Sequence, residues 1–122
     1  MTTLDKEYLR TLLRHRSDVS HKGDYGHLLL VCGCSVMPGA AVLSTGSALK
    51  SGCGLVTLHS VAQAAQAAVS RYPSAMLSVE EGTMVTDFPK DLGRYTAIAA
   101  GPGLGRDSRT AEALGRLMAE AG

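Results

Sequence analysis

Apolar residues follow two different patterns along this chain. Short uninterrupted apolar runs predict strands, and the segments between them, where apolar residues recur every three or four positions, predict helices. The expected strands are 27–32, 54–59, 74–79 and 95–100, and the expected helices are 4–15, 39–51, 62–70 and 107–120. Strands that alternate with helices of these lengths predict an α/β fold with a mostly parallel sheet, right-handed crossovers and helices on both faces.

The last predicted helix, 107–120, has no strand after it. In a parallel sheet such a helix normally crosses over to a further strand, so we expect residues 1–122 to be one N-terminal portion of a larger α/β domain. The alternative is a small doubly wound domain whose last helix simply covers the sheet. An incomplete sheet exposes one side, which favours self-association, so we also expect a homo-oligomer or a partner chain.

The first predicted helix, 4–15, is amphipathic. Its apolar side chains recur at helical spacing and form one stripe, made by Leu4, Tyr8, Leu9, Leu12 and Leu13. We therefore expect this helix to pack against the rest of the protein.

Composition and charge limit the classes of partner. The chain has 122 residues, 45% of them hydrophobic and 19% charged, which is typical of a folded soluble domain. The formal net charge of +1 provides no field for binding nucleic acid or an anionic membrane. Residues 1–16 lack a continuous apolar stretch, so we expect no secretory signal there, and no apolar run is near the eighteen or so residues of a membrane span. We expect a cytoplasmic protein with a small-molecule ligand.

Two glycine-rich turns, 33–39 and 101–105, each follow a predicted strand and precede a predicted helix. Both therefore belong at the carboxyl edge of the sheet, where open α/β folds bind ligands. Helix N-termini at that edge favour phosphate-bearing ligands. We expect the two turns to be neighbours and to border one pocket.

Each motif alone is weak. The turn 101–105 has the spacing G-x-G-x-G, and Pro102 lacks a backbone donor, so it matches the dinucleotide fingerprint poorly and fits a plain tight turn equally well. No P-loop sequence occurs. Lys22 can reach a phosphate and Asp24 can act as a base, although both also suit a solvated loop.

The cysteines and His59 are expected to be structural. The three cysteines have no zinc-site spacing and are expected to be reduced thiols, so we expect no metal site. His59 stands at the end of a predicted strand and is expected to support the fold.

Five segments follow one another in a characteristic order, namely HKGDYG at 21–26, MPGAA at 37–41, ALKSGCGLV at 48–56, YPSAM at 72–76 and IAAGPGLG at 98–105. None of these segments is specific alone, but their order along the chain is. In this order they resemble the NAD(P)H-hydrate dehydratase family, which is similar in fold to ribokinase and related small-molecule kinases.

The resemblance implies a lyase that uses ADP or ATP, with Mg²⁺, to restore NADH and NADPH from their hydrates. The nucleotide would phosphorylate the ring hydroxyl, and loss of phosphate would regenerate the dihydronicotinamide. Substrate contacts are implied at the helix start and at the second glycine-rich turn. With Lys22 from the early loop, the expected substrate-binding residues are Gly39, Ala40, Ala41, Gly101, Gly103 and Lys22.

The resemblance also implies that the catalytic residues are missing. In the family a Gly-Thr-Gly-Asp segment supplies the base and the anion hole that this reaction needs. Here the only Gly-Thr pair, Gly82-Thr83, is followed by Met84, and the only Gly-Asp pair is Gly23-Asp24. We expect no catalytic residue and no activity in this chain alone. A fragment of a small-molecule kinase and a non-enzymatic nucleotide-binding domain remain as alternatives.

Overall fold

The structure is a computed structural model and describes residues 3–13 and 25–121. It contains every strand and every long helix that the sequence predicted, with one added 3-10 turn. In chain order the elements are α1 (Lys6–Leu12), β1 (His27–Val31), α2 (Pro38–Lys50), β2 (Leu55–Val61), α3 (Ala62–Arg71), β3 (Met76–Glu80), η2 (Leu92–Arg94), β4 (Ala97–Ala100) and α4 (Ser108–Ala121).

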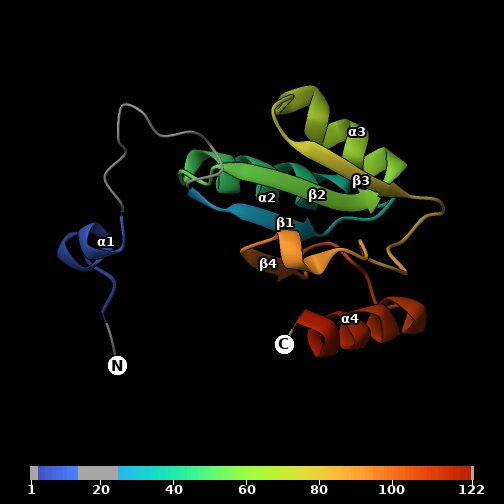
Figure 1. Cartoon of the computed structure of the whole chain (residues 1–122). Helices are drawn as coiled ribbons and strands as arrows, with labels where there is room; N and C mark the ends of the chain where they lie inside the picture. The colour runs from blue at the N-terminus through green and yellow to red at the C-terminus, as the bar shows by residue number, and fades with distance from the viewer. Residues whose placement is uncertain (1–2, 14–24, 122) are drawn as a thin grey trace.

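The four strands form one parallel sheet in the order β3-β2-β1-β4. Helices α2 and α3 cover one face of the sheet, and α4 covers the other (Figure 1). The predicted mostly parallel α/β fold with helices on both faces is therefore confirmed. The apolar run of β1 places that strand in the centre, where Leu29 pairs with Thr57 of β2 and with Ile98 of β4.

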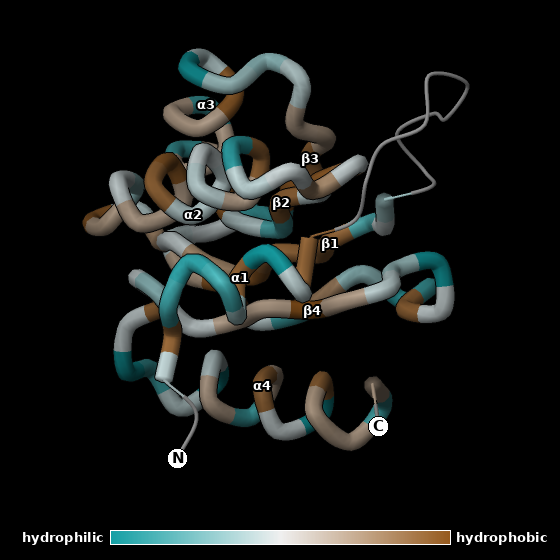
Figure 2. Tube along the Cα trace, turned by 90° about the vertical axis from the view of Figure 1, so that its left-hand side faces the viewer, coloured by the Kyte–Doolittle hydropathy of each residue, from teal (hydrophilic) through white to brown (hydrophobic). Residues whose placement is uncertain are grey.

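Side chains of β1 alternate between two hydrophobic clusters, one on each face of the sheet, and β2 contributes to the cluster under α2 and α3. Leu30 and Leu58 pack under α2 and α3, whereas Leu29 and Val31 pack under α4. Figure 2 shows hydrophobic β1 and β4 lying between α2 and α4. Burial of each such side chain contributes about 1.5–3 kcal/mol. Since β1 supplies both clusters, the position of its carboxyl end, where the candidate site begins, is strongly determined.

Helix α1 forms as predicted, but its apolar stripe is exposed. The Asp5 carboxylate accepts a hydrogen bond from the Tyr8 amide at 2.8 Å and caps the helix. Leu4 and Leu13 are nevertheless 72% and 69% exposed, and α1 stands apart from the sheet (Figure 1). The prediction that this helix packs against the rest of the protein is therefore wrong for the described part of the chain. An apolar stripe indicates that a helix has a face to bury, but it does not indicate which surface covers that face.

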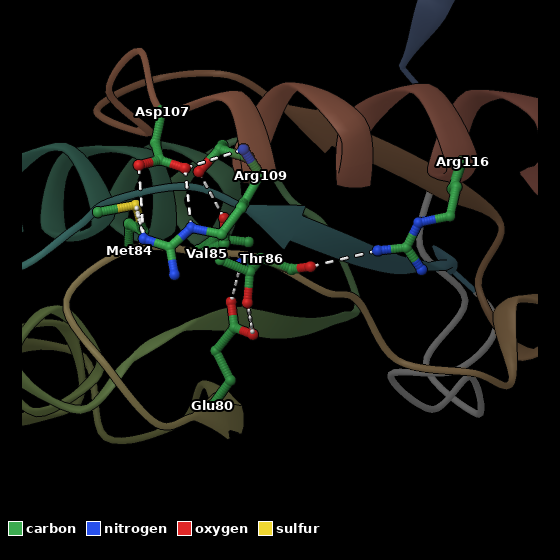
Figure 3. Close-up of polar contacts among 8 residues, drawn as sticks. Glu80, Met84, Val85, Thr86, Asp107, Arg109 and Arg116 are labelled. Carbon is green, nitrogen blue, oxygen red and sulfur yellow. Dashed lines mark hydrogen bonds and ion pairs between the residues drawn. The ribbon is translucent and has the colours of Figure 1, made fainter.

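The segment 81–96 crosses the sheet, because β3 and β4 lie at opposite edges. Val85 and Phe88 anchor it in the cluster under α4. The Thr110 hydroxyl donates to the Val85 carbonyl at 2.6 Å, and the Thr86 amide donates to the Glu80 carboxylate at 2.5 Å (Figure 3). This polar segment, which is interrupted by glycine and proline, is thus held between the sheet and α4.

A buried histidine lies where β2 and β3 pair. His59 is 4% exposed, and its Nδ1 is 2.9 Å from the Ser78 hydroxyl. Its Nε2 is 3.7 Å from the Glu80 carboxylate and has no hydrogen-bond partner among the described residues. Burial lowers the pKa of His59, and the carboxylates of Glu80 and Asp87 oppose that shift without reversing it. The neutral imidazole supports the fold, as predicted for this residue.

The unfolding free energy should fall as the pH drops below about 6.5, the ordinary pKa of histidine. The folded protein holds the pKa of His59 below that of the unfolded chain, so the unfolded chain binds protons first and acid favours unfolding. Urea denaturation between pH 7 and pH 5 should show a shallower decline for His59→Gln. His27→Gln should also show a shallower decline, since burial and Arg94 lower the pKa of His27 as well. Equal pH slopes for the parent and His59→Gln would contradict this account.

Contact between α2 and the end of α3 requires a glycine. A Cβ placed on Gly46 would overlap the Tyr72 ring. Gly46→Ala should therefore cost about 1–3 kcal/mol of unfolding free energy, measured by urea denaturation. The matched control is Gly115→Ala on α4, where a Cβ meets no atom within 4 Å and helix propensity should stabilise the fold by about 0.5–1 kcal/mol. A Gly46→Ala variant as stable as the parent would show that Tyr72 does not pack there.

Candidate functional site

The two glycine-rich turns meet at the carboxyl edge of the sheet, as predicted. The Gly33 amide donates a hydrogen bond to the Pro102 carbonyl at 2.9 Å, and the Gly101 amide donates to the Val31 carbonyl at 3.1 Å. A Cβ on Gly103 would overlap that of Ala40 and lie 3.2 Å from the Met37 carbonyl oxygen. Residues about seventy positions apart therefore form one continuous backbone surface.

Glycine is required at Gly103 for two reasons. Its φ of +68° lies in the left-handed region, which side chains disfavour, and the space that a Cβ would fill is already occupied by Ala40. By contrast, a Cβ on Gly101 or Gly105 would meet no atom within 4 Å, although both residues also have positive φ angles. The turn therefore packs tightly on α2 at its centre and remains open on both sides.

The start of α2 presents backbone donors to this surface. Met37 caps the helix without a side-chain hydrogen bond, and Pro38 follows as its first residue. The first amides of a helix lack intrahelical partners and carry the positive end of its dipole. At α4 the corresponding position is satisfied, because Asp107 accepts a hydrogen bond from the Arg109 amide at 2.8 Å. The start of α2 is thus the better place for an anionic group.

The predicted substrate residues differ in accessibility. Gly39 is exposed and Ala40 is half-buried, so both border the open surface. Ala41 is 0% exposed, and its Cβ lies 3.0 Å from the place of a Cβ on Gly33, which leaves it to support the turn from below. Lys22 lies outside the described residues, as does Asp24.

A cavity of about 230 Å³ adjoins the two turns. It is lined by residues of 34–37, 83–84 and 104–107. Sequence reasoning missed Thr83 and Met84, which reach the cavity because the crossing segment passes over the end of β1. There the Ser35 amide donates to the Thr83 carbonyl at 2.9 Å. No local pattern in the sequence marks these two residues.

Asp107 and Arg109 form an ion pair at the rim of this cavity. Arg109 Nε lies 3.1 Å from Asp107 Oδ1, and the guanidinium also contacts the Met84 sulfur at 3.6 Å (Figure 3). Hydrogen bonds from Arg109 hold the pKa of Asp107 below its ordinary value. Asp107 is therefore a weak base with its charge already paired.

The Cys32 thiol is not an activated nucleophile. Cys32, Cys34 and Cys53 are free, as predicted, and burial raises the pKa of Cys32. Residues 3–13 and 25–121 contain no group of three or more His, Cys, Asp or Glu side chains able to hold a metal ion. No helix in this part of the chain is long and apolar enough to cross a membrane.

Comparison with known proteins identifies similar sequences. The family model for NAD(P)H-hydrate dehydratase matches residues 28–121. The ADP-dependent (S)-NAD(P)H-hydrate dehydratase of Listeria monocytogenes is 37% identical over 103 residues, which cover 84% of this chain and 36% of the relative. The bifunctional NAD(P)H-hydrate repair enzyme Nnr of Synechocystis is 40% identical over 103 residues, which cover 80% of this chain and 20% of that enzyme.

Solved structures have the same fold. A ribokinase-like superfamily protein from Enterococcus faecalis superposes with a TM-score of 0.80 at 26% identity, over 96% of this chain and 40% of that one. The ADP/ATP-dependent NAD(P)H-hydrate dehydratase from Bacillus subtilis, co-crystallised with ATP/Mg²⁺, superposes with a TM-score of 0.76 at 29% identity. That match covers 94% of this chain and 41% of the Bacillus protein. The chain spans less than half the length of these relatives. Because the family model matches residues 28–121, the chain belongs to the NAD(P)H-hydrate dehydratase family, and its fold is the ribokinase-like α/β fold.

Proposed function

We propose that this chain is the N-terminal portion of an ADP- or ATP-dependent NAD(P)H-hydrate dehydratase and carries one part of its substrate site. The observation that carries the proposal is the contact between the start of α2 and the turn after β4, where Gly103 lies against Ala40. A cytoplasmic location suits this reaction, since the free thiols stay reduced there.

The surface around this contact suits a hydrated dinucleotide. Gly39, Ala40, Gly101 and Gly103 would present backbone to the ligand, with Ala41 beneath them. Lys22, which lies outside the described residues, would supply a positive charge for a phosphate. The uncapped start of α2 favours a negatively charged group. Open space beside Gly39 and Gly101 lets a ligand approach the backbone closely.

Catalysis needs groups that the described residues do not bring together. The reaction requires a base for the ring hydroxyl and an anion hole for the transferred phosphoryl group. Asp107 is the only carboxylate among the residues lining the cavity, and its pairing with Arg109 makes it a poor base. In this proposal, the part of the family's sequence that this chain does not match supplies the base and binds the nucleotide and Mg²⁺.

The edge strand β4 leaves room for a further segment of protein to dock against the sheet. In the described structure β4 pairs with β1 on one side only, and three of its four residues are exposed. Two hollows of about 580 and 430 Å³ flank η2 and the end of α4. An unpaired parallel edge beside such hollows fits either the rest of the domain or a second copy in a homo-oligomer.

The purified chain should not repair hydrated NADH on its own. Incubated with hydrated NADH and either ATP or ADP, it should produce no increase in dihydronicotinamide absorbance. A second polypeptide carrying the unmatched remainder of the Listeria relative should restore turnover when mixed with this chain. Gly103→Val in this chain should restore less turnover than its matched control Gly82→Val, because Gly82 also has a positive φ but no atom lies within 4 Å of a Cβ there.

Turnover by the chain alone would contradict the proposal. Loss of that turnover in Asp24→Ala would then show that the chain carries its own base. Equal restoration by the Gly103→Val and Gly82→Val variants would separate the activity from the contact between the two turns.

A further inference from the structure

One cationic side chain on the 230 Å³ cavity has no described partner. Arg106 lines the cavity and is exposed, and it forms no ion pair with any residue that the structure describes. The carboxylate of the neighbouring residue, Asp107, is already paired with Arg109. Asp107 Oδ1 accepts hydrogen bonds from the amide and Nε of Arg109 at 2.8 and 3.1 Å, and Oδ2 lies 3.4 Å from Arg109 Nη2.

The charges around the cavity therefore do not cancel. Arg106 and Asp107 are the charged residues among those that line it. Arg109, which does not line the cavity, neutralises Asp107. The remaining charge is the positive one of Arg106, which selects for an anionic ligand.

The other walls strengthen this selection. Val36, Met37, Met84 and Leu104 make much of the lining apolar, and ion pairs are stronger beside apolar surface than in bulk water. A volume of about 230 Å³ is below the range of about 300–1,000 Å³ that encloses a whole drug-sized ligand. The cavity can therefore enclose only one end or one group of a dinucleotide.

We propose that Arg106 binds a phosphate group of the hydrated dinucleotide. This inference rests on the proposed function and adds a specificity-determining residue to the same site. A guanidinium offers paired N–H donors that match two oxygens of a phosphate, which an ammonium group cannot do. The phosphate is either the bridging pyrophosphate, which hydrated NADH and hydrated NADPH share, or the 2′-phosphate, which only hydrated NADPH has.

Isothermal titration calorimetry on the full chain tests this role with three probes, namely hydrated NADH, hydrated NADPH and inorganic pyrophosphate. Arg106→Gln should weaken pyrophosphate binding about tenfold, the effect of losing one charge-assisted hydrogen bond. Arg106→Lys should have an intermediate affinity. The control Arg71→Gln, at the exposed end of α3 and outside the cavity lining, should bind like the parent. Thermal midpoints should be unchanged, because Arg106 is exposed.

The two dinucleotides distinguish the source of the phosphate. Equal weakening for both by Arg106→Gln supports the bridging pyrophosphate, and weakening for hydrated NADPH alone supports the 2′-phosphate. Parent-like binding of all three probes by Arg106→Gln overturns the inference and leaves the proposed function standing. Arg106-dependent binding of pyrophosphate without binding of either dinucleotide supports the phosphate site and overturns the proposed function. No binding of any probe by the parent chain overturns both.

Discussion

The close contact between the turn after β1 and the turn after β4 is the constraint on which the candidate site depends. It exists because β1 lies between β2 and β4 in a parallel sheet, so the carboxyl ends of neighbouring strands come together. The hydrogen bond from the Gly33 amide to the Pro102 carbonyl joins the two turns. Gly103 then brings its backbone against Ala40 at the start of α2. A larger residue at Gly103 would separate the turns and move the start of α2, which borders the candidate site.

The connection from β3 to β4 completes the site from a distance. Because these strands occupy opposite edges, the connection crosses the face under α4, where Thr110 and Glu80 hold it. Its Thr83 and Met84 then form one wall of the cavity beside the turns. The contacts that fix the crossing segment therefore also shape the cavity.

Much of this architecture could be predicted from the sequence. The uninterrupted apolar run of β1 indicated a strand buried on both faces, and the position of both glycine-rich turns after parallel strands predicted that they would meet. The cavity wall could not be predicted, because it depends on the strand order, which no local period encodes. Likewise, the stripe on α1 showed a need for burial but not its partner, and its side chains are exposed in the described structure. The carboxylate of Asp107 shows the same limit, since only the structure reveals that it is paired with Arg109.

The central claim is that the surface formed by the two turns binds the hydrated dinucleotide. Amide chemical shifts of the ¹⁵N-labelled chain, followed by NMR during titration with hydrated NADH, test it most directly. Glycines serve as probes at both edges of the sheet. The account predicts the largest shifts at Gly39, Gly101 and Gly103, and much smaller ones at Gly26 and Gly54, which precede β1 and β2 at the opposite edge. Shifts concentrated at Gly26 and Gly54, or saturable binding without any shift at the two turns, would contradict it.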